Sequence, residues 1–265
     1  MSLLDPPLEL LHEPAGLPAL ELPDALAAAY PGTFGFPARR TFANFVQTLD
    51  GVTAIPSLPQ SNRLIAGGSA ADRFVMGLLR ACADTVLVGA GTFRKTRGAL
   101  FRADAIHPDG ASAFAELRER LGLAPHPRLV VVTRSGAVDP AEPALDGALV
   151  VTSRAGEAAL RGRVSPNTEV VALGADTLLL GDVVALLRKR GTELLLTEGG
   201  PSLFAEAVRA KLVDELFVTK SPALFGRYPN DRRKSLADGF DLSGVSMDLL
   251  SVRRHGSYLF LRYAL

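Results

Sequence analysis

Short apolar runs alternate with helical patterns along most of this chain, and no other feature constrains the fold as strongly. The runs TVLVG (85–89), RLVVVT (128–133) and ALVVTS (148–153) are rich in β-branched residues. Strands that are apolar on both faces are typical of a parallel sheet with helices on both sides. We therefore expect an α/β fold built on a mostly parallel sheet.

Further segments extend this pattern toward both ends of the chain. We expect strands at 42–49, 169–173, 192–197, 214–221, 247–254 and 257–265, helices at 24–30, 69–83, 114–122, 181–191 and 202–212, and a loop at 94–110. His255 and Gly256 separate the last two strands, and such a short separation favours an antiparallel hairpin. The sequence thus predicts helices on both faces of the sheet and an antiparallel hairpin at its C-terminal edge.

Residues 1–37 are rich in Pro, Leu and Ala, and the alternation begins only after them. We interpret 1–37 as an N-terminal arm that packs on a single domain, 38–265. A chain of 265 residues that is 48% hydrophobic can form one large core.

The composition excludes several classes of function. The chain has 29 Lys and Arg against 28 Asp and Glu, so it lacks the charge excess of a nucleic-acid-binding protein. With one cysteine, Cys82, it can form neither an internal disulfide nor a cysteine-based zinc site, and we expect no metal. No apolar run reaches the length of about 18 residues that a membrane span needs, and the first residues do not resemble a signal peptide. We expect a cytoplasmic protein with a small-molecule substrate.

Four expected strand ends carry polar residues, and ligands of open α/β sheets bind at the carboxyl ends of strands. The first is TLDG (48–51), where Asp50 and Gly51 form a strong turn signal. Asp50 is either a solvated turn residue or a carboxylate that orients a polar substrate or relays a proton.

The second strand end reads GAGT (89–92). Gly89 and Gly91 allow close approach of a ligand to the backbone, and Thr92 can cap a helix or bind a phosphate. Because the third glycine of the dinucleotide fingerprint is missing, a tight turn and a phosphate loop remain equal alternatives.

The third strand end carries Thr133, Arg134 and Ser135. Two hydroxyls and a guanidinium are groups that bind a phosphate monoester such as the 2′-phosphate of NADPH. The alternative is a polar loop with an exposed arginine.

The fourth strand end reads EGGP (198–201) before an expected helix. Gly199, Gly200 and Pro201 leave backbone N–H groups free of side chains at the helix start, which suits an anion. Glu198 would repel a phosphate beside it, so we expect its carboxylate to face a donor-rich organic substrate. The alternative is that Glu198 only interacts with the helix dipole.

These motifs, in this order, resemble the reductase domain of riboflavin biosynthesis, which shares the dihydrofolate reductase fold. The matching segments are NFVQTLDG (44–51), LLRACADTVLVGAGT (78–92), RLVVVTRS (128–135), LLLTEGGPSLFAEAV (194–208) and LVDELFVTKSPALFG (212–226). The last two are the most specific, and the resemblance covers about residues 40–262.

The resemblance implies an NADPH-dependent reductase of 5-amino-6-(5-phosphoribosylamino)uracil or a close analogue, with hydride delivered to the ribosyl C1. It implies cofactor contacts at Gly89, Gly91, Thr92, Thr133, Arg134, Ser135, Gly199, Gly200 and Pro201. Asp50 and Glu198 match the positions that face substrate and nicotinamide, and we take them as catalytic. Relatives are usually dimers, so we expect a homodimer, with the strand edge at 247–265 as its candidate interface.

The chain departs from the family pattern in three respects. It lacks the His-x-Glu and Pro-Cys-x-x-Cys motifs of the fused zinc deaminase. An arginine-rich segment replaces the usual Asp-rich loop, and its Arg94 and Arg97 either bind the substrate phosphate or are solvated. Asn44 stands where several relatives carry a lysine, and we assign Asn44 and Thr48 to substrate binding.

Two alternatives remain open. The first is an NADPH-dependent dihydrofolate or pterin reductase, which an open apolar pocket beside 93–110 would favour, whereas phosphate-binding cations there would favour the phosphoribosyl substrate. The second is a non-catalytic nucleotide-binding module that binds NADPH without oxidising it.

Overall fold

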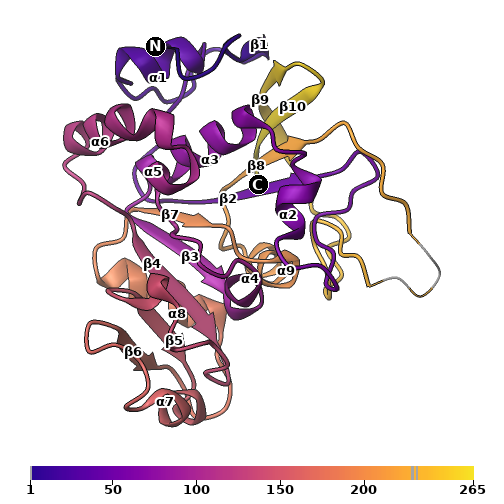
Figure 1. The fold of residues 1–265 in the computed structure, drawn as a ribbon. Helices are drawn as coiled ribbons and strands as arrows, with labels where there is room; N and C mark the ends of the chain where they lie inside the picture. Colours follow the sequence, from indigo (N-terminus) through magenta and orange to yellow (C-terminus); the bar gives the residue numbers. More distant parts are fainter. Residues whose placement is uncertain (1, 228–229, 231) are drawn as a thin grey trace.

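The computed structural model describes residues 2–227, 230 and 232–265, which form one large sheet with helices on both faces (Figure 1). Within these residues ten strands lie in the order β1-β9-β10-β8-β2-β7-β3-β4-β5-β6. The strands are β1 (Glu9–His12), β2 (Arg40–Gln47), β3 (Thr85–Gly89), β4 (Arg128–Thr133), β5 (Leu149–Thr152), β6 (Glu169–Ala172), β7 (Leu194–Thr197), β8 (Glu215–Lys220), β9 (Asp248–His255) and β10 (Tyr258–Ala264).

The sheet is parallel from β8 to β6 and antiparallel at its other end. The pairs β8–β2, β2–β7, β7–β3, β3–β4, β4–β5 and β5–β6 are all parallel. β10 runs antiparallel to β8 and to β9, which confirms the predicted hairpin. The arm adds a strand that the sequence did not predict, because β1 pairs antiparallel with β9 and covers its edge.

The helices confirm the predicted pattern and add short elements to it. They are α1 (Asp24–Ala29), α2 (Ser61–Ile65), α3 (Ala70–Cys82), α4 (Ala90–Lys95), α5 (Ala103–Ile106), α6 (Ala111–Arg120), α7 (Arg154–Leu160), α8 (Leu180–Lys189) and α9 (Pro201–Arg209), with 3-10 turns at Pro108–Gly110 and Pro143–Leu145. The segment expected as a loop at 94–110 is therefore partly helical, with 96–102 outside the helices. None of the described helices is both long and apolar enough to cross a bilayer.

Two hydrophobic layers enclose the sheet, one on each face. Phe42 and Val86 pack in the layer that holds α3 and α6, together with Phe74. Their chain neighbours Ala43 and Leu87 belong to the opposite layer, which holds α8 and α9. Because successive strand residues point to opposite faces, each parallel strand needs apolar residues throughout, as the sequence has them.

Within residues 2–37, β1 lies beside β9 at the antiparallel end of the sheet, and α1 lies next to α6 (Figure 1). Leu8 and Phe34 are buried in the core, and Glu13 accepts a hydrogen bond of 2.8 Å from Arg253 of β9. The arm is therefore packed into the sheet structure. Met1 lies outside the described residues, and a domain boundary at residue 37 remains a prediction.

Candidate active site

A cavity of about 590 Å³ opens beside the carboxyl ends of the parallel strands. Its walls come from β2, from the segment that carries α2, from α3, from the segment that runs from α4 to α5, and from the turn between β7 and α9. This volume lies within the range of about 300–1,000 Å³ that is typical of ligand sites.

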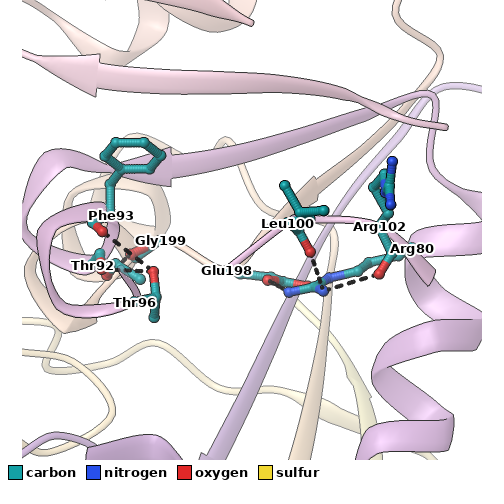
Figure 2. A network of polar contacts seen from close by, with 8 residues as sticks. All are labelled: Arg80, Thr92, Phe93, Thr96, Leu100, Arg102, Glu198 and Gly199. Atoms are coloured by element: carbon teal, nitrogen blue, oxygen red, sulfur yellow. Dashed lines mark hydrogen bonds and ion pairs between the residues drawn. The ribbon is translucent and has the colours of Figure 1, made fainter. Parts of the chain in front are cut away.

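Arg80 and Glu198 form an ion pair in the wall of this cavity (Figure 2). Arg80 Nε donates to Glu198 Oε1 at 2.8 Å and Nη2 donates to Oε2 at 2.7 Å. Nη1 donates to the carbonyl oxygens of Arg102 at 3.2 Å and Leu100 at 3.5 Å. This geometry fixes the plane of the Glu198 carboxylate and leaves one lone pair on each of its oxygens for another donor.

The sequence places Arg80 here through a stripe along α3. Asp72, Met76 and Arg80 are four residues apart, so they lie on one side of the helix, and all three line the cavity. Phe74 and Leu78 form a second stripe that is buried in the core. One helix thus supplies both a packing face and a wall of the site.

Asp72 is a site residue that the sequence prediction missed. It is 5% exposed, and burial raises the pKa of its carboxyl to about 6, because a charge is poorly solvated there. The Thr219 hydroxyl and the charge of Arg73 oppose this shift, and the charge of Glu198 adds to it. Within the described part of the chain, no arginine or lysine forms an ion pair with Asp72.

The turn between β7 and α9 contacts α4 closely. Gly200 has φ 116°, a conformation that favours glycine, and a Cβ there would lie 2.8 Å from Thr92 Oγ1. Thr92 Oγ1 donates to the carbonyl oxygen of Gly199 at 2.8 Å (Figure 2). Pro201 begins α9. The two turns that the sequence assigned to the cofactor therefore lie side by side.

The other glycines of these turns differ in their surroundings. A Cβ at Gly91 would meet no atom within 4 Å, so that backbone faces open space. A Cβ at Gly89 would lie 3.2 Å, and one at Gly199 2.6 Å, from the side chain of Leu203. Gly89 and Gly199 thus permit the strand ends to pack against α9.

The residues predicted at the end of β4 lie beside this region. Thr133 is buried, whereas Arg134 and Ser135 are exposed at the carboxyl end of β4, the strand next to β3. The Arg134 carbonyl oxygen accepts a hydrogen bond of 2.7 Å from Ser153 Oγ. The loop backbone is therefore held in place while the two exposed side chains remain accessible.

Asp50 is exposed and joins two loops. Its Oδ1 accepts from Thr48 Oγ1 at 2.5 Å, and its Oδ2 accepts from the backbone N–H of Gly226 at 2.7 Å. Hydrogen bonds from Thr48 and from the N–H groups of Phe225 and Gly226 lower the pKa of the Asp50 carboxyl. Neither Asp50 nor Thr48 lines the cavity, and their roles in a reaction remain predictions.

The cations of the segment after α4 are divided between the cavity and the surface. Arg94 Nη1 donates to the carbonyl oxygen of Ala137 at 2.7 Å, away from the cavity lining. Arg97 lines the cavity but is also ion-paired with Asp139 and Glu142. Lys95, Arg63 and Arg73 line the cavity as well.

The structure brings part of the predicted site together. Asn44, Thr92, Arg97, Glu198, Gly200 and Pro201 line one cavity. Thr48, Asp50, Gly89, Gly91, Arg94, Thr133, Arg134, Ser135 and Gly199 do not line it. Among the described residues, no group of three His, Cys, Asp or Glu side chains is placed to hold a metal ion.

Residues 40–261 match a family model described as the RibD C-terminal domain. A 2,5-diamino-6-ribosylamino-4(3H)-pyrimidinone 5′-phosphate reductase from Archaeoglobus fulgidus is 28% identical over 191 residues. The match covers 70% of this chain and 81% of that reductase.

Two solved structures share the fold. A pyrimidine reductase-like protein from Corynebacterium diphtheriae matches with a TM-score of 0.68 and 20% identity, over 92% of this chain and 95% of that one. A diaminohydroxyphosphoribosylaminopyrimidine deaminase/5-amino-6-(5-phosphoribosylamino)uracil reductase from Thermotoga maritima matches with a TM-score of 0.60 and 18% identity, over 86% of this chain and 56% of that one.

Proposed function

The chain belongs to the RibD C-terminal domain family, as its motifs predicted, and from this premise we propose that it is an NADPH-dependent reductase of a phosphoribosylaminopyrimidine. One observation carries the proposal: the family's specific EGGP segment places Glu198 in the wall of a ligand-sized cavity, beside the turn formed by Gly200 and Thr92. The name of the Archaeoglobus reductase supports this choice of substrate class.

The residues of the two glycine turns fit a dinucleotide. Gly91 faces open space, and Gly200 lies against Thr92 with no side chain of its own between them. We assign the pyrophosphate to these turns, at the start of α9, and the 2′-phosphate to Arg134 and Ser135. When bound, NADPH supplies the hydride for the reduction.

The cavity has groups that suit the phosphoribosylaminopyrimidine substrate. Lys95, Arg97 and Arg63 would bind its phosphate, and Asn44 would contact the pyrimidine. In the reaction, the bond from the ribosyl C1 to the ring oxygen breaks, hydride adds to C1, and the ring oxygen takes one proton. The product is the open-chain ribityl compound.

The protein contributes orientation and exclusion of water. Arg80 holds the Glu198 carboxylate so that its free lone pairs can accept from substrate hydroxyl or amino groups. Asp50 acts indirectly in this proposal, because it anchors the loop at Phe225 and Gly226 through their backbone N–H groups.

A pterin or dihydrofolate reductase is the second candidate. Met76, Leu100, Phe101 and Ile106 line the same cavity and would pack against a bicyclic ring. The cations on the wall favour the phosphorylated substrate, so we place the pterin second.

The homodimer also remains a proposal. Because β1 pairs with β9, the hairpin does not present β9 as a free edge, and the outer edge of β1 is the candidate for pairing between copies. Light scattering at working concentration tests this: a monomer mass would exclude the dimer.

The function is tested by mixing the purified chain with NADPH and each of three compounds: 2,5-diamino-6-(5-phosphoribosylamino)pyrimidin-4(3H)-one, 5-amino-6-(5-phosphoribosylamino)uracil, and dihydrofolate. We expect NADPH consumption with a phosphoribosyl compound, a ribityl product by mass spectrometry, and slower consumption of NADH. Consumption with dihydrofolate alone would favour the second candidate. Binding of NADPH with no consumption in any mixture would contradict both and favour a non-catalytic module.

A further inference from the structure

Asp72 differs from the other buried acids of the described chain in its partners. Asp72 and Glu215 are the most deeply buried acids there, each 5% exposed. Glu215 Oε2 accepts from Arg262 Nε at 2.7 Å, and Glu198 is bound by Arg80. Asp72 interacts with the Thr219 hydroxyl and forms no ion pair with a described residue.

This arrangement leaves most of the acceptor capacity of Asp72 unused. An ionised carboxylate has about four acceptor positions, and one hydroxyl fills one of them. Burial of a carboxylate with so few partners is costly, and such groups cluster at functional sites. The cost is explained if a ligand supplies the missing donors.

The position of Asp72 points to a substrate. It lies in the first turn of α3 and lines the cavity with Asn44 and Ser69, whose Oγ accepts from the Asp72 N–H at 3.2 Å. The α3 stripe then leads through Met76 to Arg80 and the fixed carboxylate of Glu198. The cavity wall thus carries one carboxylate that is paired by the protein and one that is not.

A carboxylate distinguishes two kinds of pyrimidine ring. In a 2-amino-4-oxopyrimidine, N3–H and the 2-amino group are adjacent donors, which match the two oxygens of a carboxylate. In a 2,4-dioxopyrimidine, N3–H lies between two carbonyl oxygens, so the second carboxylate oxygen would face an acceptor. Such a mismatch of buried polar groups is strongly selective.

We propose that Asp72 selects substrates with a 2-amino-4-oxopyrimidine edge over substrates with a 2,4-dioxopyrimidine edge. This inference rests on the proposed function and narrows it to substrates whose 2-amino group has not been removed. Pterins carry the same edge, so a pterin would use Asp72 in the same way.

The test compares two phosphoribosylaminopyrimidines that differ only at C2, amino or oxo. For the wild-type chain with NADPH, we expect kcat/KM to be about 100-fold higher for the amino compound, mainly through KM. In Asp72→Asn, the amide offers one donor and one acceptor, which match the dioxo edge. The preference should therefore fall by more than about 100-fold, so that the variant favours the oxo compound. The control Asp182→Asn, on the exposed side of α8, should keep the wild-type preference.

Calorimetry without cofactor makes the same comparison, because it measures the dissociation constants of the two compounds for the wild type and for Asp72→Asn. Equal affinities in the wild type, or a preference that Asp72→Asn retains, would overturn the proposal even if both compounds are reduced. If neither compound is reduced, the proposed function fails, and the dissociation constants still decide the role of Asp72. If dihydrofolate alone is reduced, the 2-amino-4-oxopyrimidine edge that Asp72 binds would be that of a pterin. If Asp72→Asn does not fold, the wild-type comparison decides.

Discussion

Two regions of the molecule contain the same chemical unit, an arginine–glutamate pair with little exposure to solvent. Where the arm packs on β9, Arg253 pairs with Glu13 at 2.8 Å, with 1% and 11% of the side chains exposed. In the cavity wall, Arg80 pairs with Glu198 at 2.7 Å, with 6% and 8% exposed. The pairs differ in what surrounds them.

Each side-chain nitrogen of Arg253 donates a hydrogen bond to the protein. Nε and Nη2 donate to the carbonyl oxygens of Pro31 and Thr33, Nη1 donates to Ser251 Oγ, and the guanidinium lies 3.9 Å from the centre of the Tyr30 ring. Arg80, in contrast, borders a cavity. The comparison teaches that one pair joins two segments of chain, whereas the other holds an acceptor toward a ligand. The first should affect stability alone and the second both stability and turnover.

The largest effect on stability is expected at the arm. Arg253→Ala should lower the free energy of unfolding by about 3–5 kcal/mol, because it leaves the Glu13 carboxylate without its cationic partner and removes the donor to two carbonyl oxygens. Urea unfolding measures this. The adjacent control Arg254→Ala breaks an exposed pair with Glu9 and should cost about 0–1 kcal/mol. Equal losses in the two variants would contradict the structural role of Arg253.

The cavity pair is tested by a single and a double variant. Arg80→Leu should lower the free energy of unfolding by about 3 kcal/mol, because Glu198 remains buried without its partner. Arg80→Leu combined with Glu198→Leu should recover most of that loss, since two apolar side chains can replace a buried ion pair. Neither variant should regain turnover, measured as NADPH consumption. Wild-type turnover in the double variant would show that the pair is only structural.

The pH dependence of stability distinguishes Asp72 from the paired carboxylates. The pKa of its carboxyl in the folded state, about 6, lies above the usual value of 3.8, so the folded state binds this proton more tightly than the unfolded state does. The protonated Asp72 carboxyl therefore contributes its full share to the free energy of unfolding at low pH, and this share is lost as pH rises from about 4 to about 6. The stability of Asp72→Asn relative to wild type should therefore increase by roughly 1–3 kcal/mol between these pH values. Chemical unfolding at both pH values measures it.

The control for this pH effect is Asp50→Asn. Because hydrogen bonds lower the pKa of Asp50, the wild-type residue stabilises the fold at neutral pH and loses this contribution as pH falls. The sign of the pH dependence should thus be opposite to that of Asp72→Asn. Identical signs in the two variants would contradict the assigned surroundings of Asp72.

The smallest effect is expected at the turn before α9. Gly200→Ala forces a side chain into φ 116° and against Thr92 Oγ1, which should cost about 1–2 kcal/mol and weaken NADPH binding. The control is Gly181→Ala in α8, where a Cβ would meet no atom within 4 Å. Gly181→Ala should be neutral or stabilising by less than about 1 kcal/mol. Unaltered NADPH affinity in Gly200→Ala, by calorimetry, would remove this turn from the cofactor site.

The parallel part of the fold was predictable because the apolar residues of each strand indicate that the strand is buried on both faces. The runs at β3, β4 and β5 are apolar on both faces, and the sheet covers both faces with helices. β1 was not predictable in this way, because all four residues of Glu9–His12 are exposed and show no alternation. Its strand geometry comes from pairing with β9 at the far end of the chain.

The site was predictable where strand ends converge. Thr92 and the EGGP turn meet because β3 and β7 are neighbouring parallel strands. Arg80 and Asp72 were missed because they lie on a helix, and only its apolar stripe was recognised. The polar stripe at spacings of four residues, Asp72 to Met76 to Arg80, was the available signal. Nothing in the sequence near Arg80 identifies Glu198, 118 positions away, as its partner.

The central claim is that the protein catalyses hydride transfer, in this cavity, from NADPH to the ribosyl C1 of a phosphoribosylaminopyrimidine. The most direct measurement uses NADPH with deuterium at the transferred position of the nicotinamide, the wild-type chain and the 2-amino phosphoribosyl substrate. Mass spectrometry of the product then locates the label. We expect one deuterium at C1 of the ribityl chain. A product without deuterium, or with deuterium on the pyrimidine ring, would contradict the account.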